Sequence, residues 1–226
     1  MNGVENRRPI KSRGAGWARG SAAGLARMGV TPDAISAGSV VFAGLGGALM
    51  VGSSLTTGPA RAAALVAAAA CVQGRLICNL LDGMVAVEHG KGSPSGPIWN
   101  ELPDRIADLL LLVGAGYAGA LMGQPWAEPL GWLAGALAVL TAYVRELGRG
   151  LGQPADFSGP MAKPHRMATL TAACLLAALE PLWGGRGQVL AIALAAIAAG
   201  AAWTVVRRVG HLARGLSEAR SLSAGE

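Results

Sequence analysis

The chain has 226 residues, of which 52% are hydrophobic and 14% charged, and its formal net charge at pH 7 is +6. Its apolar runs reach about twenty residues, the length that crosses a bilayer core, so a soluble globular protein is not expected. The basic residues gather at the two ends of the chain, which the positive-inside bias of membrane proteins explains, so we expect no nucleic-acid partner.

Residues 1–33 form a basic segment with the pattern of a short amphipathic helix. Trp17, Leu25 and Met28 fall on one helical face, while Arg19 and Arg27 project elsewhere. Such a helix rests on an anionic membrane surface next to the first span. The segment is too polar for a signal peptide, because it has no apolar stretch followed by a cleavage site.

The remaining chain predicts an all-α polytopic membrane protein with six transmembrane helices. An even number of spans puts both termini on one side, and the distribution of Lys and Arg places that side in the cytoplasm of a cell membrane. We expect a six-helix membrane domain over 34–206 and a basic cytoplasmic tail over 207–226. The expected spans are Ala34–Leu55, Ala60–Leu81, Arg105–Met122, Pro129–Leu147, Met167–Leu182 and Gln188–Val206.

Local signals within the spans suggest a helix start and a packing face. Thr31 or Asp33 can cap the first span, because both residue types accept hydrogen bonds from free backbone N–H groups. The first span also carries small residues at helical spacing, which suit close contact with a neighbouring helix or a second subunit, and we expect a homodimer. These residues are Ala43, Gly44, Gly47 and Ala48. The three cysteines lie in apolar runs and are expected to be reduced.

Polar residues cluster where the second span ends and the third begins. Arg75, Asn79 and Asp82 recur at helical spacing, and so do Asn100, Asp104 and Asp108. Acids at a membrane edge need pairing, hydration or a bound cation, and carboxylate and amide oxygens suit Mg²⁺ or Mn²⁺. Simpler interpretations are that Asn100 caps a helix, that Asp104 pairs with Arg105, and that Arg75 pairs with Asp82 or Asp104.

The same residues carry a resemblance to a known family. The stretch is similar to the signature of the CDP-alcohol phosphotransferases, Asp-x2-Asp-Gly-x2-Ala-Arg-x8-Gly-x3-Asp-x3-Asp, and it fits that spacing without a gap. Three positions depart from it, because Asn79 and Asn100 replace acids and Val87 replaces the arginine. The stretch GVTPDAIS and the expected six spans also match the family. The matching positions are Asn79, Asp82, Gly83, Ala86, Gly96, Asn100 and Asp104.

The resemblance implies an enzyme of phospholipid biosynthesis. Members transfer a substituted phosphoryl group from a CDP-linked donor, usually CDP-diacylglycerol, to an alcohol acceptor and release CMP. It implies Asp104 as general base, and a Mg²⁺ or Mn²⁺ site formed by Asp82, Asp104, Asn79 and Asn100. Glu101 or Asp108 could compensate for the lost acids. The implied substrate-binding residues are Gly83, Ala86, Gly96, Arg145, Lys163 and Arg166, although Lys163 and Arg166 could equally serve only to orient the chain in the membrane. Arg75 or Lys91, which lie outside the signature, could bind substrate in place of the arginine lost at Val87.

Two other functions stay open at this point. A non-catalytic relative that binds nucleotide or lipid would explain why Asn79, Asn100 and Val87 depart from the signature. A transporter or channel would use membrane-embedded acids as an ion path, but here the acids cluster at one side of the membrane instead of its midplane.

Overall fold

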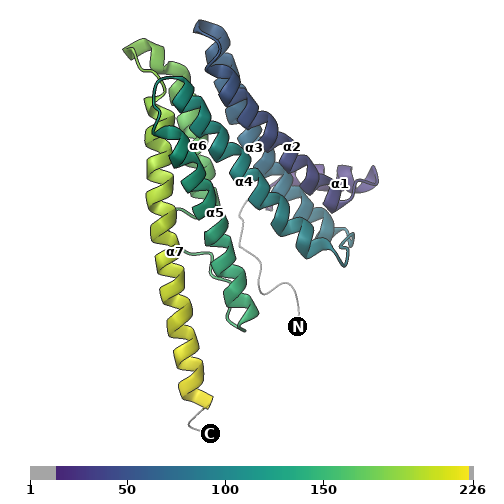
Figure 1. Cartoon of the computed structure of the whole chain (residues 1–226). Helices are drawn as coiled ribbons and strands as arrows, with labels where there is room; N and C mark the ends of the chain where they lie inside the picture. The colour runs from purple at the N-terminus through teal and green to yellow at the C-terminus, as the bar shows by residue number, and fades with distance from the viewer. Residues whose placement is uncertain (1–13, 224–226) are drawn as a thin grey trace.

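The computed structural model describes residues 14–223, and within that range every regular element is a helix (Figure 1). Seven α-helices and one short 3₁₀ helix follow one another along the described chain. The all-α prediction is therefore confirmed. The helices are α1 (Gly16–Arg27), α2 (Pro32–Ser53), α3 (Gly58–Glu88), α4 (Gly96–Leu121), α5 (Ala127–Gly150), α6 (Lys163–Leu179), η2 (Glu180–Trp183) and α7 (Gln188–Ser223).

Proline sets the start of four of the long helices. It occupies the first or second position of α2, α3, α4 and α6, where its missing N–H breaks no helical hydrogen bond. At α2 the cap is Thr31, whose Oγ1 accepts a hydrogen bond from the backbone N–H of Ala34 at 3.2 Å. Of the two caps expected for this helix, Thr31 is therefore the one observed.

The helices form one bundle in which chain neighbours are not always spatial neighbours. α2 packs on α3 and α4, α5 packs on α4 and α7, and α6 packs on α3 and α7. In the lower half of Figure 1, α2, α3 and α4 lean towards α1 and diverge from α5 and α7. The first turn of α6 meets inner turns of α3 and α4, because Lys163 and Arg75 both pair with Asp104.

The small-residue face of α2 is used inside the chain. A Cβ built on Gly47 would lie 2.7 Å from the backbone oxygen of Leu110, and one built on Gly114 would lie 2.7 Å from the Cα of Gly47. α2 and α4 therefore touch backbone to backbone, which only glycine permits. Packing on a neighbouring helix is therefore confirmed for Ala43 and Gly47, whereas Gly44 is half-buried and Ala48 is exposed. The homodimer stays a prediction.

The bundle has the length and surface of a multi-pass membrane protein. Within residues 14–223, four helices are long and apolar enough to cross a membrane: α2, α3, α5 and α7. Large apolar side chains also lie exposed on the outside, among them Val41 at 61%, Ile192 at 61% and Trp203 at 62%. α6 has 17 residues and α4 carries charges along its first turns, so the count of six spans is not confirmed.

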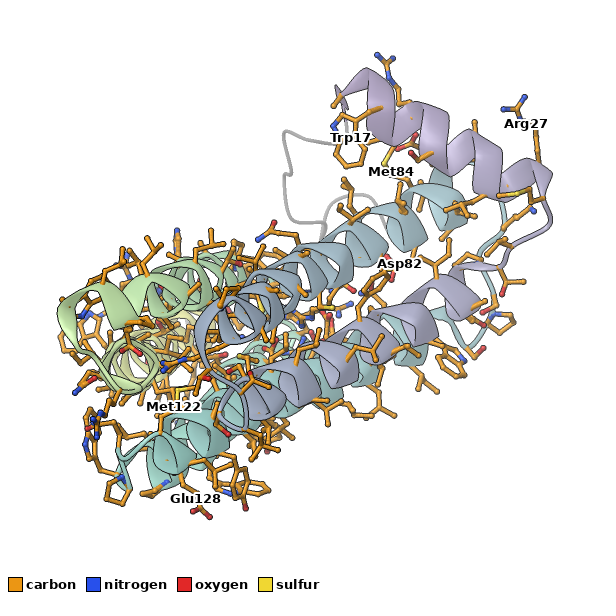
Figure 2. All side chains as sticks on the ribbon, turned by 90° about the horizontal axis from the view of Figure 1, so that it is seen from above. Trp17, Arg27, Asp82, Met84, Met122 and Glu128 are labelled. Carbon is orange, nitrogen blue, oxygen red and sulfur yellow. The ribbon has the colours of Figure 1, made fainter. Side chains whose placement is uncertain are left out.

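α1 lies across the end of α3, as expected for a helix next to the first span. Its Ala18 and Ala22 are fully buried against a cluster that contains Met84, and Figure 2 shows Met84 between the two helices. Trp17 is 52% exposed and Met28 is 72% exposed. The helix is therefore present, whereas its contact with a membrane surface stays a prediction.

The structure corrects several local expectations. Asn100 does not cap a helix, because α4 already begins at Gly96, and Pro103 is accommodated inside it. Glu180 is fully buried and accepts hydrogen bonds from Arg61, from the backbone N–H of Gly187 just before α7, and from that of Val189 in its first turn. The cysteines form no disulfide, as expected.

Candidate functional site: a buried cluster of acids and bases

Three helices bring their polar residues together at one end of the bundle. α3 contributes Arg75, Asn79 and Asp82, α4 contributes Asp104 and Asp108, and α6 contributes Lys163 and Arg166. The two predicted polar faces do meet, because Asn79 on α3 donates a hydrogen bond to Oδ1 of Asp104 on α4. The cluster therefore joins segments that lie up to 91 residues apart in the chain, from Arg75 to Arg166.

Asp108 lies at the closed bottom of the cluster. It is fully buried, and Arg75 donates to its Oδ1 at 2.6 Å while Arg166 donates to its Oδ2 at 2.7 Å. Arg166 also donates to the carbonyl oxygen of Met161 at 2.9 Å. Since both carboxylate oxygens are held by buried guanidinium groups, Asp108 serves to position the two arginines and is closed to a substrate.

Asp104 lies one helical turn nearer the open end and is also surrounded by donors. Arg75 approaches its Oδ1 at 3.3 Å and its backbone oxygen at 3.2 Å. Lys163 forms an ion pair with its Oδ2, and Arg105 lies 3.4 Å from the same oxygen. Its side chain keeps 12% exposure, against 1% for Asp108, so Asp104 is the acid that a substrate could reach.

Asp82 is held by neutral groups only. Its Oδ2 accepts a hydrogen bond from Ser36 Oγ on α2 at 2.6 Å, and its Oδ1 accepts one from the backbone N–H of Gly83. Among the described residues it forms no ion pair within 4 Å, although Asp104 and Lys163 lie close enough to act on its charge. Figure 2 shows Asp82 on the face of α3 turned away from α1.

The other expected site residues lie around this cluster or outside it. Asn100 is exposed, and its side chain forms no hydrogen bond among residues 14–223, although it stands on the same helix as Asp104. Glu101 binds Arg145 and lies 3.4 Å from Arg105, so neither it nor Asp108 supplies a spare carboxylate. Gly83, Ala86 and Gly96 lie at the ends of α3 and α4 beside the 89–95 connection.

A cavity of about 300 Å³ opens beside the cluster, between α5, α7 and the 151–162 connection. Arg145 lines it together with Asp156, Arg208 and His211. Lys163 and Arg166, two further residues expected to bind substrate, lie in the buried cluster next to this cavity. Arg208 joins the two places, because it donates to the backbone oxygen of Thr141, whose hydroxyl accepts a hydrogen bond from Arg166.

Asp156 and His211 close one side of this cavity. His211 Nδ1 lies 3.0 Å from Asp156 Oδ2, and the backbone N–H of Ser158 donates to Oδ1 at 2.7 Å. Burial alone would raise the pKa of Asp156, but hydrogen bonds from Ser158 and His211 and the charge of Arg208 together lower that pKa below its usual value. Sequence reasoning did not find this pair, because its two residues lie 55 positions apart.

The oxygen atoms of the cluster that are free of cationic partners are those that could hold a hard divalent ion. Asp82 has no cationic partner, and Asn79, one turn earlier on α3, offers a carbonyl oxygen because its amide nitrogen is bonded to Asp104. Asp104 already binds a lysine and two arginines. No group of three or more His, Cys, Asp or Glu side chains among residues 14–223 is placed to hold a metal ion.

Comparisons with known proteins give no sequence-level relative but a clear structural likeness. No family model matches the chain, and no curated protein matches it. Crystal structures of phosphatidylinositol phosphate synthase from Mycobacterium tuberculosis do match. The structure with CDP-DAG bound has a TM-score of 0.71 at 20% identity, covering 86% of this chain and 92% of that one.

Two further structures of that enzyme agree. The complex with manganese and citrate has a TM-score of 0.70 at 20% identity, covering 86% of this chain and 88% of the other. The apo form has a TM-score of 0.67 at 21% identity, covering 85% and 94%. The chain therefore has the fold of this phosphatidylinositol phosphate synthase along most of its length.

Proposed function

We propose that this chain is a CDP-alcohol phosphotransferase, which transfers a phosphatidyl group from a CDP-linked lipid to an alcohol and releases CMP. The observation that carries the proposal is the meeting of Asp82, Asn79 and Asp104 at the signature spacing, on the fold of an enzyme whose crystal structure holds CDP-DAG. The proposal places the site on the cytoplasmic side of a cell membrane, open to lipid.

Charge and position assign a role to each side chain in this reaction. The acceptor hydroxyl oxygen bonds to the lipid phosphorus, the bond from phosphorus to the CMP oxygen breaks, and CMP leaves with the electron pair. Asp104, the more exposed acid, takes the hydroxyl proton. Arg75 and Arg166 hold Asp108 and thereby fix the positive floor of the site.

A divalent ion at Asp82 would stabilise negative charge on the pyrophosphate and on the departing CMP. Asp82 and the carbonyl oxygen of Asn79 are the residues that would hold it. Mn²⁺ is a reasonable first choice, because a solved structure with this fold contains manganese.

The acceptor alcohol is proposed to enter the cavity beside the cluster. Arg145 and Arg208 make that cavity positive, and Arg208 reaches Thr141, which is bonded to Arg166. An acceptor with an anionic or polyol headgroup suits such a lining. Homodimer formation and contact with membrane lipids belong to the same proposal.

The test is CMP release by the full chain in lipid nanodiscs that contain CDP-diacylglycerol, with Mn²⁺ and candidate alcohols. We expect release to fall about 100-fold or more in Asp104→Asn, the usual effect of losing a general base. Glu128→Gln is the matched control, since Figure 2 places Glu128 at the opposite end of the bundle from Asp82. Mass spectrometry of lipids in cells that express the chain identifies the product, which should vanish in Asp82→Ala.

A second candidate is a relative that binds the nucleotide without turnover. The observation that favours it is the saturation of Asp104 by Lys163, Arg75 and Asn79, which leaves this acid a weak base. Binding of CDP without CMP release under any acceptor would support this candidate and refute the transferase.

A further inference from the structure

The charges of the cluster balance without any added ion. Its acids are Asp82, Asp104 and Asp108, and its cations are Arg75, Lys163 and Arg166, so three negative charges face three positive ones. Arg105 adds a shared charge at the rim, but it also lies 3.4 Å from Glu101. A buried group of charges is stable when it is paired in this way, and each added ion must therefore be matched by an incoming anion.

The cluster has more hydrogen-bond donors than hydrogen-bond acceptors. Within the cluster, three buried donor atoms have no hydrogen-bond partner: Nε and Nη1 of Arg75, and Nε of Arg166. Buried donors without an acceptor cost free energy. These atoms are fully buried, so an incoming phosphate would act on the two guanidinium groups through its negative charge, whereas a metal ion alone would add positive charge.

Lys163 occupies the position at Asp104 that a metal ion would need. Its ammonium group binds Asp104 Oδ2, and the lysine stands at the first residue of α6, directly before Pro164. The side chain is 22% exposed, against 0% for Arg75 and 1% for Arg166. Since an ammonium group has three donors, Lys163 can bind Asp104 and still offer donors to a phosphate oxygen.

Asp82 is the one acid of the cluster that gains from a metal ion. It is 6% exposed and bonded only to neutral donors, so its charge is unpaired. One divalent ion there would leave the cluster with two net positive charges, which match the doubly charged pyrophosphate of a CDP-linked donor. A second ion would leave four, far beyond what that substrate balances.

We propose that Lys163, bound to Asp104, acts as a fixed cation that faces the substrate pyrophosphate. The chain then binds a single divalent ion, at Asp82 and Asn79. It binds this ion tightly only together with the nucleotide. The identity of the nucleotide rests on the proposed function. The number of bound ions, and the role of Lys163 in setting that number, do not rest on the proposed function.

The experiment is a titration of the full chain in detergent with Mn²⁺, followed by the electron paramagnetic resonance signal of free Mn²⁺, with and without CDP. We expect one Mn²⁺ per chain, with an affinity at least about tenfold higher when CDP is present. Lys163→Met should strengthen Mn²⁺ binding without CDP by about tenfold or add a second ion, and should weaken CDP binding. Lys163→Arg, which keeps the charge, should still bind one ion.

Two controls separate this effect from general charge and from misfolding. Arg149→Met removes an exposed cation that pairs with Glu146 and should leave the Mn²⁺ curve unchanged. Asp82→Asn should abolish Mn²⁺ binding, so the site is tested even where Lys163→Met fails to fold. Two tightly bound ions in the unmodified chain, or a Lys163→Met variant with unchanged affinity for Mn²⁺ and CDP, would overturn the proposal. One ion without any CMP release would refute the transferase and leave the ion count intact.

Discussion

Replacing Asp108 with asparagine tests whether this acid stabilises the fold, in contrast to Asp104, the acid proposed to react. The change keeps the size of the side chain but removes the charge that two buried guanidinium groups share at 2.6 and 2.7 Å. Removing one partner of a buried ion pair costs about 3–5 kcal/mol, because the remaining charge stays buried. Asparagine still accepts one of the two hydrogen bonds, so we expect a loss of about 3 kcal/mol, the lower end of that range.

The measurement is thermal unfolding in detergent, read by the fraction of the protein that stays monodisperse after heating. Asp104→Asn is the matched control: it lies one turn away on α4 with 12% side-chain exposure, and it should lose stability by less than half as much. The double variant Asp108→Asn with Arg166→Gln should cost less than the sum of the two single changes, because they share one interaction. An Asp108→Asn protein as stable as the unmodified chain would refute the assignment of this acid to the framework.

Two further predictions concern packing and pH. Gly47→Ala should destabilise the bundle by about 1–3 kcal/mol, because the added Cβ would meet the backbone of α4. Gly44→Ala should be neutral or slightly stabilising, because the atom nearest to its added Cβ is 4.0 Å away. Equal melting temperatures for the two variants would contradict the close contact. The lowered pKa of Asp156 means that its bonds stabilise the fold above about pH 4, the ordinary carboxyl value, and that this contribution disappears as the pH falls through the lower folded value. The melting temperature of Asp156→Asn should therefore lie below that of the unmodified chain at pH 6, and the difference should shrink as the pH falls below about 4 and through the lowered pKa of Asp156. A difference that does not shrink with falling pH would refute the assignment.

Most of the helical architecture could be predicted from the sequence, because the length of an apolar run and the spacing of residues along a helix are local properties. The boundaries at the polar ends were less accurate. α3 continues to Glu88, beyond the predicted end at Leu81, and α4 begins at Gly96 instead of Arg105. Both extensions follow from packing of amphipathic turns outside the apolar run, which a search for twenty apolar residues does not detect.

The sequence predicted which residues of α3 and α4 share a face, but not which side chains from other helices bind them. The spacing of Asn79, Asp82 and Asp104 correctly indicated that α3 and α4 meet, since spacing along a helix fixes which residues share a face. The bond from Ser36 to Asp82 spans 46 residues, and the one from Arg166 to Asp108 spans 58. Such pairs depend on how α2 and α6 cross the other helices, and no local pattern encodes that.

The backbone contact between Gly47 and Gly114 also limits how the bundle can move. Gly46 beside it meets Leu111 of the same helix, so the two helices are in close contact over adjacent residues and their relative tilt is fixed there. Ser36 lies on the arm of α2 on one side of this point and Ser53 on the other, so a change of tilt moves the two ends in opposite directions. A substitution that pushes α2 away from α4 at Gly47 would therefore also shift Ser36, whose hydroxyl holds Asp82.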